Sequence, residues 1–262
     1  MVAISRAQKR YNTPCIQDGQ SKSPLSVVLK TKHYLVVKKM PSATVSRKPK
    51  KGGEVDRVYA LLKGWILDCR FRPGDFLPEV EVATQCNTSR TPIREACGRL
   101  AEEKWLAKIK NRGYIVAPIS LQEIIEVYQF RKLLECFTAR RTAKLISPEE
   151  IAGLRRIVEV ESHINVKMSE LIDANEAFHR AVGKLAQNQR ILDQLALILE
   201  YVHRLDVLSV QRDTEWVNHD SILAALEAHD VKGAHRAMAL HIDSSRDRML
   251  RLFWGRELPG IR

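Results

Sequence analysis

The spacing of apolar residues along the chain changes near residue 118. Between residues 54 and 100, apolar side chains recur every three or four positions in three short segments, which predicts three helices. Two short apolar runs follow at 105–109 and 114–116, separated by a basic turn, and predict a strand hairpin. From residue 119 the helical spacing continues with almost no strand alternation. We therefore predict a mainly α protein in which a small helix-and-hairpin unit precedes an antiparallel all-α bundle.

The first unit contains two predicted helices joined by a short polar turn. The first of them covers Pro78–Cys86, the turn is Asn87 and Thr88, and the second runs from Ser89 to Leu100. A further helix, Glu54–Cys69, precedes the pair and ends at a Pro-Gly turn. Helix, short turn and second helix form a helix-turn-helix, and a following hairpin forms a wing. The candidate packing residues of the first helix of the pair are Val80, Val82 and Ala83.

The predicted helix at residues 89–100 has an apolar face and a cationic face. We expect Ser89 to be its N-cap and Pro92 to lie in its first turn. Arg90, Thr91 and Arg94 share the cationic face, which would suit a DNA major groove. A solvated amphipathic helix is the alternative for so short a segment, but the flanking helix and hairpin favour DNA binding. The opposite, apolar face carries Ile93, Ala96, Cys97 and Leu100.

Three ordered motifs between residues 71 and 116 resemble the winged helix-turn-helix of GntR-type transcriptional regulators. Arg72–Leu77 resembles the family's PG-x-x-L segment, Ser89–Ala96 resembles its SRTPVREA signature, and Asn111–Gly113 resembles its wing tip. The resemblance implies a sequence-specific DNA-binding regulator. One departure is Val80, which stands where the FadR-like branch often has a base-contacting arginine. The expected DNA-binding residues are Ser89, Arg90, Thr91, Arg94, Lys110, Arg112 and Gly113.

Net charge changes this picture little. Residues 1–53 hold twelve Lys or Arg and one Asp, which leaves 31 basic and 30 acidic residues for the rest of the chain. We therefore expect residues 1–53 to be a basic, disordered tail, 54–118 the DNA-binding domain, 119–254 an effector-binding and dimerisation domain, and 255–262 a second tail. A flexible cationic tail can add phosphate affinity. Translation from Met40, which would shorten the tail, is an alternative.

Other function classes find no support in the sequence. There is no uninterrupted apolar run of about 18 residues and no signal-peptide core, so we expect a cytoplasmic protein that does not enter a membrane. The five cysteines are scattered, which argues against a disulfide framework or a zinc finger. They are Cys15, Cys69, Cys86, Cys97 and Cys136.

The second unit has clear helix starts. Ser120 and Ser147 are each followed three residues later by glutamate, which is the capping-box pattern. Six or seven helices in this length predict a compact bundle. Its 20 basic and 21 acidic residues give no reason to place nucleic acid on it, so sensing and dimerisation are the expected roles. The later helices are expected to begin near Ser169, Gln189, Thr214 and Val231.

Three histidines of the second unit fall on apolar faces of predicted helices. They are His179, His219 and His241, and each taken alone is typical of a hydrogen-bonded core residue. Three together favour a shared polar site, because one divalent metal ion can satisfy several buried imidazoles. Spacing alone leaves both interpretations open.

Residues 120–250 resemble the FCD ligand-binding domain of the FadR-like branch, and this resemblance implies a metal site. It assigns Asn175, His179, His219 and His241 as metal ligands, with zinc or nickel expected. Asn175 replaces the family's aspartate, so we expect weaker metal binding and a preference for an anionic co-ligand such as a small carboxylate. Arg131 and Arg204 are candidate carboxylate clamps, with ion pairs to Glu135 and Asp206 as the alternative.

The sequence as a whole predicts a homodimeric transcriptional regulator that binds double-stranded operator DNA and responds to a small-molecule effector. The expected mechanism is an equilibrium between two placements of the winged domains, which the effector biases. One alternative is the same regulator with a metal-free pocket for a neutral or lipidic effector. A metal-dependent enzyme is the other alternative; no nucleophile motif or obvious general base supports it, so we expect no enzymatic activity.

Overall fold

The structure is a computed structural model that describes residues 53–163, 166–209 and 216–254. The predicted tails at 1–52 and 255–262, the alternative start at Met40 and the predicted helix start at Thr214 lie outside the described residues. Within the described ranges, no helix is long and apolar enough to cross a membrane.

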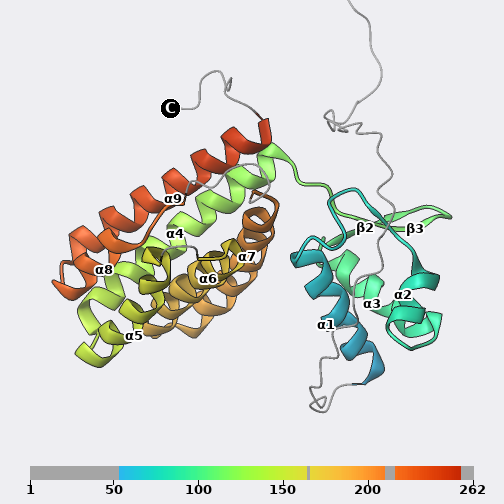
Figure 1. The fold of residues 1–262 in the computed structure, drawn as a ribbon, viewed down its shortest axis with the longest axis horizontal. Helices are drawn as coiled ribbons and strands as arrows, with labels where there is room; N and C mark the ends of the chain where they lie inside the picture. The colour runs from blue at the N-terminus through green and yellow to red at the C-terminus, as the bar shows by residue number, and fades with distance from the viewer. Residues whose placement is uncertain (1–52, 164–165, 210–215, 255–262) are drawn as a thin grey trace, which may run out of the picture. The chain divides into compact units, whose positions relative to one another are not determined.

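The first part of the described chain is a winged helix-turn-helix (Figure 1). Strand β3 lies between β1 and β2 and pairs antiparallel with both, so that Ile115 faces Phe76 on one side and Ala107 on the other. The three helices and the hairpin confirm the prediction. Strand β1 was not predicted, because two residues are too few to show alternation. The elements are α1 (Glu54–Leu67), β1 (Phe76–Leu77), α2 (Glu79–Gln85), α3 (Arg90–Glu102), β2 (Leu106–Ile109) and β3 (Gly113–Val116).

The apolar faces of these elements close one core. Helix α1 contributes Val58, Leu62 and Ile66, and the apolar face of α3 is buried as predicted. Val80 was a candidate packing residue, and that expectation is wrong, because its side chain is 60% exposed on the first turn of α2. The core of the winged part also contains Leu77, Val82, Ala83, Cys86, Trp105, Leu106, Tyr114 and Val116.

The start of α3 departs from the expected capping. Ser89 occupies the N-cap position with an extended backbone, but its side chain makes no capping hydrogen bond. A capping side chain binds the backbone N–H of the second or third helical residue, and the third residue here is Pro92, which has none. Ser89 therefore marks the helix start through its backbone conformation.

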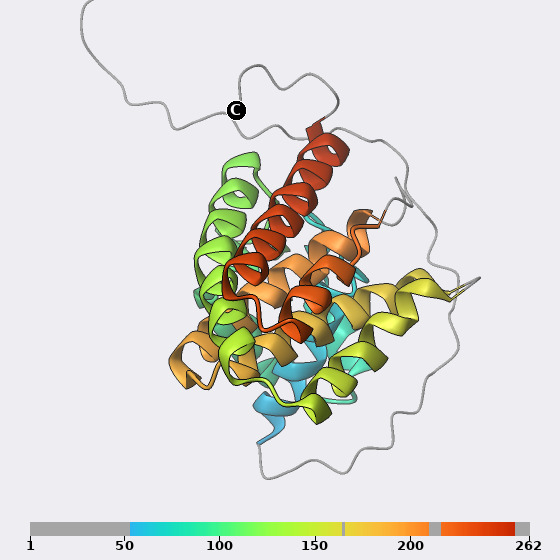
Figure 2. The same ribbon diagram turned by 90° about the vertical axis from the view of Figure 1, so that its left-hand side faces the viewer.

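The second part of the described chain is a bundle of helices (Figure 2). Both predicted caps are present: the Ser120 side chain accepts from the Glu123 N–H, and Ser147 and Glu150 form a complete capping box. The helices are α4 (Leu121–Leu145), α5 (Pro148–Val158), a short 3₁₀ turn (Glu159–Ser162), α6 (Met168–Leu185), α7 (Gln189–Ser209), α8 (Asp220–Glu227) and α9 (Val231–Trp254).

The two longest helices, α4 and α9, lie side by side and antiparallel (Figures 1 and 2). The Tyr128 hydroxyl hydrogen-bonds to Ser245 at 3.1 Å, and Lys132 contacts Asp243 at 2.6 Å one turn further along α4. The bundle core is mostly apolar, but a group of polar side chains is buried inside it. This group includes Arg131, Glu135, Asn175, His179, Asp206, His219, His241 and Arg248.

Candidate nucleic-acid interface and metal centre

A groove of about 760 Å³ runs across the winged part between the starts of α2 and α3 and the wing. Helix α3 places Arg90 and Arg94 at one wall, and the wing supplies Lys108, Arg112 and Gly113 at another. The exposed side chain of Val80 also lines this groove. Four predicted DNA-binding residues, Arg90, Arg94, Arg112 and Gly113, therefore line one hollow.

Two of the three arginines of α3, Arg90 and Arg94, are exposed and share one acidic partner. The side chains of Arg90 and Arg94 are 55% and 60% exposed. Arg94 Nε donates to Glu79 Oε2 at 2.8 Å, and Arg90 Nη2 lies 3.6 Å from the same oxygen. Exposed ion pairs of this kind contribute little to stability, so a phosphate can replace the carboxylate at small cost.

The remaining predicted DNA-binding residues lie around the groove. Ser89 and Thr91 are exposed at the start of α3, and Lys110 is exposed in the wing turn without lining the groove. Gly113 has a φ of +99°, a left-handed conformation that favours glycine. The wing turn therefore depends on this glycine.

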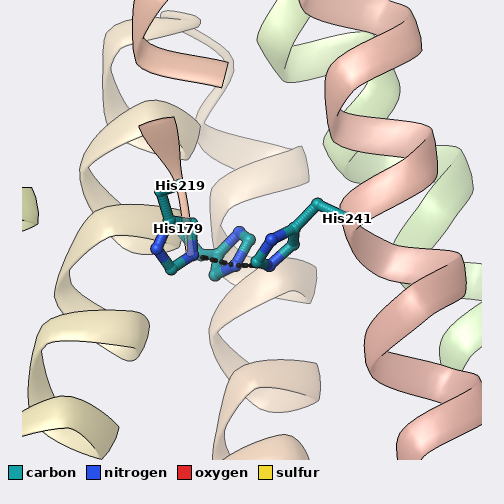
Figure 3. Close-up of side chains that lie close together, drawn as sticks. All are labelled: His179, His219 and His241. Carbon is teal, nitrogen blue, oxygen red and sulfur yellow. Dashed lines mark hydrogen bonds between the residues drawn. The ribbon is translucent and has the colours of Figure 1, made fainter. Parts of the chain in front are cut away.

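Three imidazole rings meet inside the bundle (Figure 3). His179 comes from α6, His241 from α9, and His219 from the residue that precedes α8, where the sequence pattern placed it within a helix. His179 Nε2 lies 3.1 Å from His241 Nε2 and 3.1 Å from His219 Nε2. All three side chains are buried. The structure therefore brings the three histidines into a group that could hold a metal ion.

The Nδ1 atom of each ring has its own acceptor on the side away from this meeting point. His179 Nδ1 donates to Glu135 of α4, and His219 Nδ1 donates to Glu161 at 2.6 Å. His241 Nδ1 donates to the backbone oxygen of Asn218 at 3.1 Å. Carboxylate and carbonyl oxygens only accept, so all three Nδ1 atoms carry the proton. A metal-binding histidine is typically held in this way by a second, outer partner.

This pattern leaves the three Nε2 atoms without protons when the rings are neutral. Burial, helped by Arg131 and the neighbouring His219, holds the pKa of His179 well below its usual value. Burial and the two other histidines act in the same direction on the pKa of His241. Two neutral rings that are protonated at Nδ1 cannot hydrogen-bond through Nε2, so their lone pairs face one another. A shared cation satisfies these atoms, and the residues present therefore fit a metal ion.

Asn175 lies one turn before His179 on α6, and its amide nitrogen donates to Asp206 at 3.2 Å. Asp206 also pairs with Arg248 at 2.9 Å, and burial raises the pKa of Asp206 above its ordinary value. Because the amide nitrogen of Asn175 faces Asp206, the side-chain carbonyl oxygen of Asn175 does not bind Asp206. This oxygen is the atom that would coordinate a metal ion. A cavity of about 10 Å³, the size of one water, borders Asn175, Asp206 and His241.

The two candidate clamp arginines occupy different surroundings. Arg131 is fully buried, and its Nε donates to Glu135, the same carboxylate that holds His179. Within the described residues, neither terminal nitrogen of Arg131 has a hydrogen-bond partner. Arg204 is also buried, but one of its terminal nitrogens donates to the backbone oxygen of Ala117. The ion pair of Arg131 with Glu135 is one of the alternatives that the sequence left open. The other alternative paired Arg204 with Asp206, but Asp206 pairs with Arg248.

Sequence reasoning missed the outer partners of the histidines. Glu135 carried a weak signal, because it follows Arg131 by four residues on one helix face. Glu161 carried none, since it lies in the 3₁₀ turn and meets His219 across 58 residues of sequence.

Family models match both parts of the chain. Residues 54–116 match the model of bacterial regulatory proteins of the gntR family, and residues 126–244 match the FCD domain. The chain is 30% identical over 160 residues to the Nta operon transcriptional regulator of Aminobacter aminovorans, covering 61% of this chain and 72% of that protein. The protein belongs to the GntR family. Its winged helix-turn-helix and FCD domain give it the FadR-like architecture.

Other relatives agree with this assignment. The HTH-type transcriptional repressor RspR of Escherichia coli is 28% identical over 193 residues, which cover 71% of this chain and 84% of that protein. The solved structure of Escherichia coli McbR/YncC has a TM-score of 0.65 at 19% identity and covers 76% of this chain and 98% of that one. This GntR-family protein is a DNA-binding transcriptional regulator with an effector-binding FCD domain.

Proposed function

We propose that the protein binds a two-fold symmetric operator as a homodimer, and that a small carboxylate bound at a divalent metal in the FCD domain changes its operator affinity. The observation that carries the proposal is the convergence of three Nε2 atoms on rings whose Nδ1 atoms already have acceptors. The proposed ligands are His179, His219 and His241, with the carbonyl oxygen of Asn175 as a further donor. Imidazole ligands suit zinc or nickel. When bound, the metal supplies positive charge to a site whose four protein ligands are neutral.

An anionic effector follows from the charges around this site. The four proposed ligands are neutral, and of the three carboxylates around them Glu135 is paired with Arg131 and Asp206 with Arg248. Glu161 therefore offsets only part of the charge of a divalent cation. The buried Arg131 has two terminal nitrogens available, which a carboxylate could bind as a fork. Arg204 faces the Ala117 carbonyl in this structure, so we assign it a smaller part in effector binding than Arg131.

The small size of the cavity suggests how effector binding could be coupled to a conformational change. A space of about 10 Å³ accommodates one water, whereas a carboxylate needs more room. The effector would therefore favour a state in which the lining side chains, among them Trp216 and Arg248, have moved. A ligand shifts the equilibrium only by its difference in affinity for the two states.

On DNA, Arg90, Thr91 and Arg94 would contact the major groove while Lys108, Lys110 and Arg112 lie beside phosphates. Ser89 would contact the backbone at the start of α3, and Gly113 would permit close approach of the wing. Because the proposed target is operator DNA, we also propose that the protein acts in the cytoplasm.

The carboxylates near the histidines are not placed to act as the general base that a metal-dependent enzyme would need. Glu135 and Glu161 bind the Nδ1 atoms and therefore lie behind the rings, away from the Nε2 atoms where a metal-activated water would be. These carboxylates orient the ligands. The relatives are regulators as well, so we propose that the protein has no enzymatic activity.

Elemental analysis of the purified protein and thermal shift with added metals test the proposal. We expect bound metal, or a melting temperature that rises with zinc or nickel, because a ligand that binds only the folded state stabilises it. His219→Ala should remove the response, while His235→Ala, an exposed histidine of α9, should keep it. Absence of both metal and thermal response in the wild type would support the metal-free pocket for a neutral or lipidic effector.

The effector arm uses small carboxylates added to the metal-loaded protein, with operator affinity as the readout. Arg131→Lys is the sharper variant, since lysine keeps the positive charge but loses the planar fork. A carboxylate that changes operator affinity in the wild type should lose most of this effect in the variant.

A further inference from the structure

The outward face of α4 carries large apolar side chains that nothing in the described structure covers. Leu133 is 72% exposed, and Phe130 and Phe137 on either side of it are also exposed. The rest of this helix is well buried in the bundle through Tyr128, Cys136 and Ala139. A soluble domain rarely exposes two phenylalanines and a leucine on one helix face unless another surface binds there.

These residues belong to a regular stripe along α4. Exposed residues recur at 126, 130, 133, 137, 140 and 144, alternating steps of four and three, which is the spacing of a helix that packs against another helix. The three middle positions are apolar. At the N-terminal end the stripe has Glu126, and at the C-terminal end it has Arg140 and Lys144. We call these residues the α4 stripe.

The α4 stripe is complementary to itself when reversed. Glu126 lies seven residues before Leu133 and Arg140 lies seven residues after it. In an antiparallel pair centred on Leu133, the acidic end of each stripe therefore meets the basic end of the other. In the same register Phe130 comes opposite position 136, one residue from Phe137. Self-complementarity of this kind is what a two-fold, isologous contact requires.

We infer that the α4 stripe is a homodimer contact, in which two copies of α4 pack antiparallel across a two-fold axis at Leu133. Glu126 then pairs with Arg140 of the partner subunit, and the apolar centre is covered by the same residues of the second copy. The inference rests on the homodimer of the proposed function. It adds which surface of each subunit forms the contact and in which register the two helices pack.

Sedimentation equilibrium of the full chain tests the contact through Leu133→Glu. Two glutamates would meet at the axis, so we expect the dimer dissociation constant to rise about 100-fold or more. The substituted position is exposed in the isolated chain, so the variant should still fold, with the helix content of the wild type by circular dichroism. Leu197→Glu is the matched control: this leucine of α7 is 55% exposed and lies outside the stripe, and its variant should remain dimeric.

Charge exchange tests the register. Glu126→Arg and Arg140→Glu should each weaken the dimer several-fold, because each places like charges opposite one another twice. The double variant should recover the wild-type dissociation constant, and an equimolar mixture of the two single variants should form heterodimers. In a parallel pair, Glu126 would instead face Glu126 of the partner subunit. The double variant would then have no lower dissociation constant than the single variants.

The outcomes separate the surface from the proposed function. A dimeric Leu133→Glu variant overturns this surface and leaves the homodimer intact. A monomeric wild-type chain overturns both, and means that another occupant covers the stripe. If Leu133→Glu fails to fold, the charge exchange decides alone: recovery in the double variant supports the contact, and no recovery overturns it.

Discussion

The two functional regions hold their charged and titratable groups in opposite ways. Arg90 and Arg94 of α3 are more than half exposed and share a single carboxylate, Glu79. The histidines of the FCD domain are buried, and each ring is fixed by an acceptor on its Nδ1 atom. The first region can exchange its partner for a phosphate at little cost. The second is preorganised, so changes there should affect folding and binding together.

The largest effect is expected where a buried carboxylate serves both an arginine and a histidine. Glu135→Gln removes the charge that balances Arg131 and changes the acceptor of His179, and both partners are fully buried. We expect a loss of roughly 3–5 kcal/mol in unfolding free energy. Metal affinity should fall about 10–100-fold. Chemical denaturation and metal titration measure the two effects.

The exposed pair Glu227–Arg155 provides the control for that experiment. Glu227→Gln should leave both metal affinity and unfolding free energy close to the wild type. Equal losses in the two variants would remove the contrast between buried and exposed carboxylates.

The second effect concerns α3. Arg94→Ala should lower specific operator affinity about 10–100-fold, because a bidentate arginine contact discriminates strongly between bases. The melting temperature should stay at the wild-type value, since the side chain is exposed. Arg99 on the same helix pairs with Asp56 instead, and Arg99→Ala should leave operator affinity nearly unchanged. A parallel drop in melting temperature and affinity for Arg94→Ala would make it a structural residue.

The third effect tests the replacement of aspartate by Asn175. Asn175→Asp would place a second carboxylate beside Asp206, whose oxygen now lies 3.2 Å from the amide nitrogen. Like charges at this distance are costly when buried, so the metal-free variant should melt at a lower temperature than the wild type. Metal affinity should rise about tenfold, because the new ligand is anionic. Calorimetry with and without metal measures both, and unchanged affinity would place Asn175 outside the ligand set.

The smallest effect concerns the carboxylate that the α3 arginines share. Glu79→Gln would release Arg90 and Arg94 from their common partner. Affinity for non-specific DNA should rise about two- to fivefold, with a slightly steeper dependence on salt concentration. Binding measured at several salt concentrations tests this, and an affinity below that of the wild type would show that Glu79 instead positions the arginines for DNA.

The two regions also differ in how far the sequence predicted them. The α3 site is local: the signature at residues 89–96 sets the helix start and its cationic face within one turn. What the sequence missed there was tertiary, namely that Glu79 reaches both arginines and that Val80 is exposed in the groove. In the FCD domain the three histidines could be selected from helical spacing and resemblance, but Glu161 could not, because its contact with His219 depends on how the chain folds back.

The sequence by itself determined the two-part organisation, the capped helix starts and the candidate metal and DNA residues, because helical periodicity, capping and contiguous motifs are local properties of the chain. Only the tertiary structure decided which atoms of the histidines meet. Glu135, Glu161 and the Asn218 carbonyl each accept a hydrogen bond from one Nδ1 atom, which leaves the three Nε2 atoms facing one another. That hydrogen-bonding pattern depends on packing between distant segments, which no local pattern records.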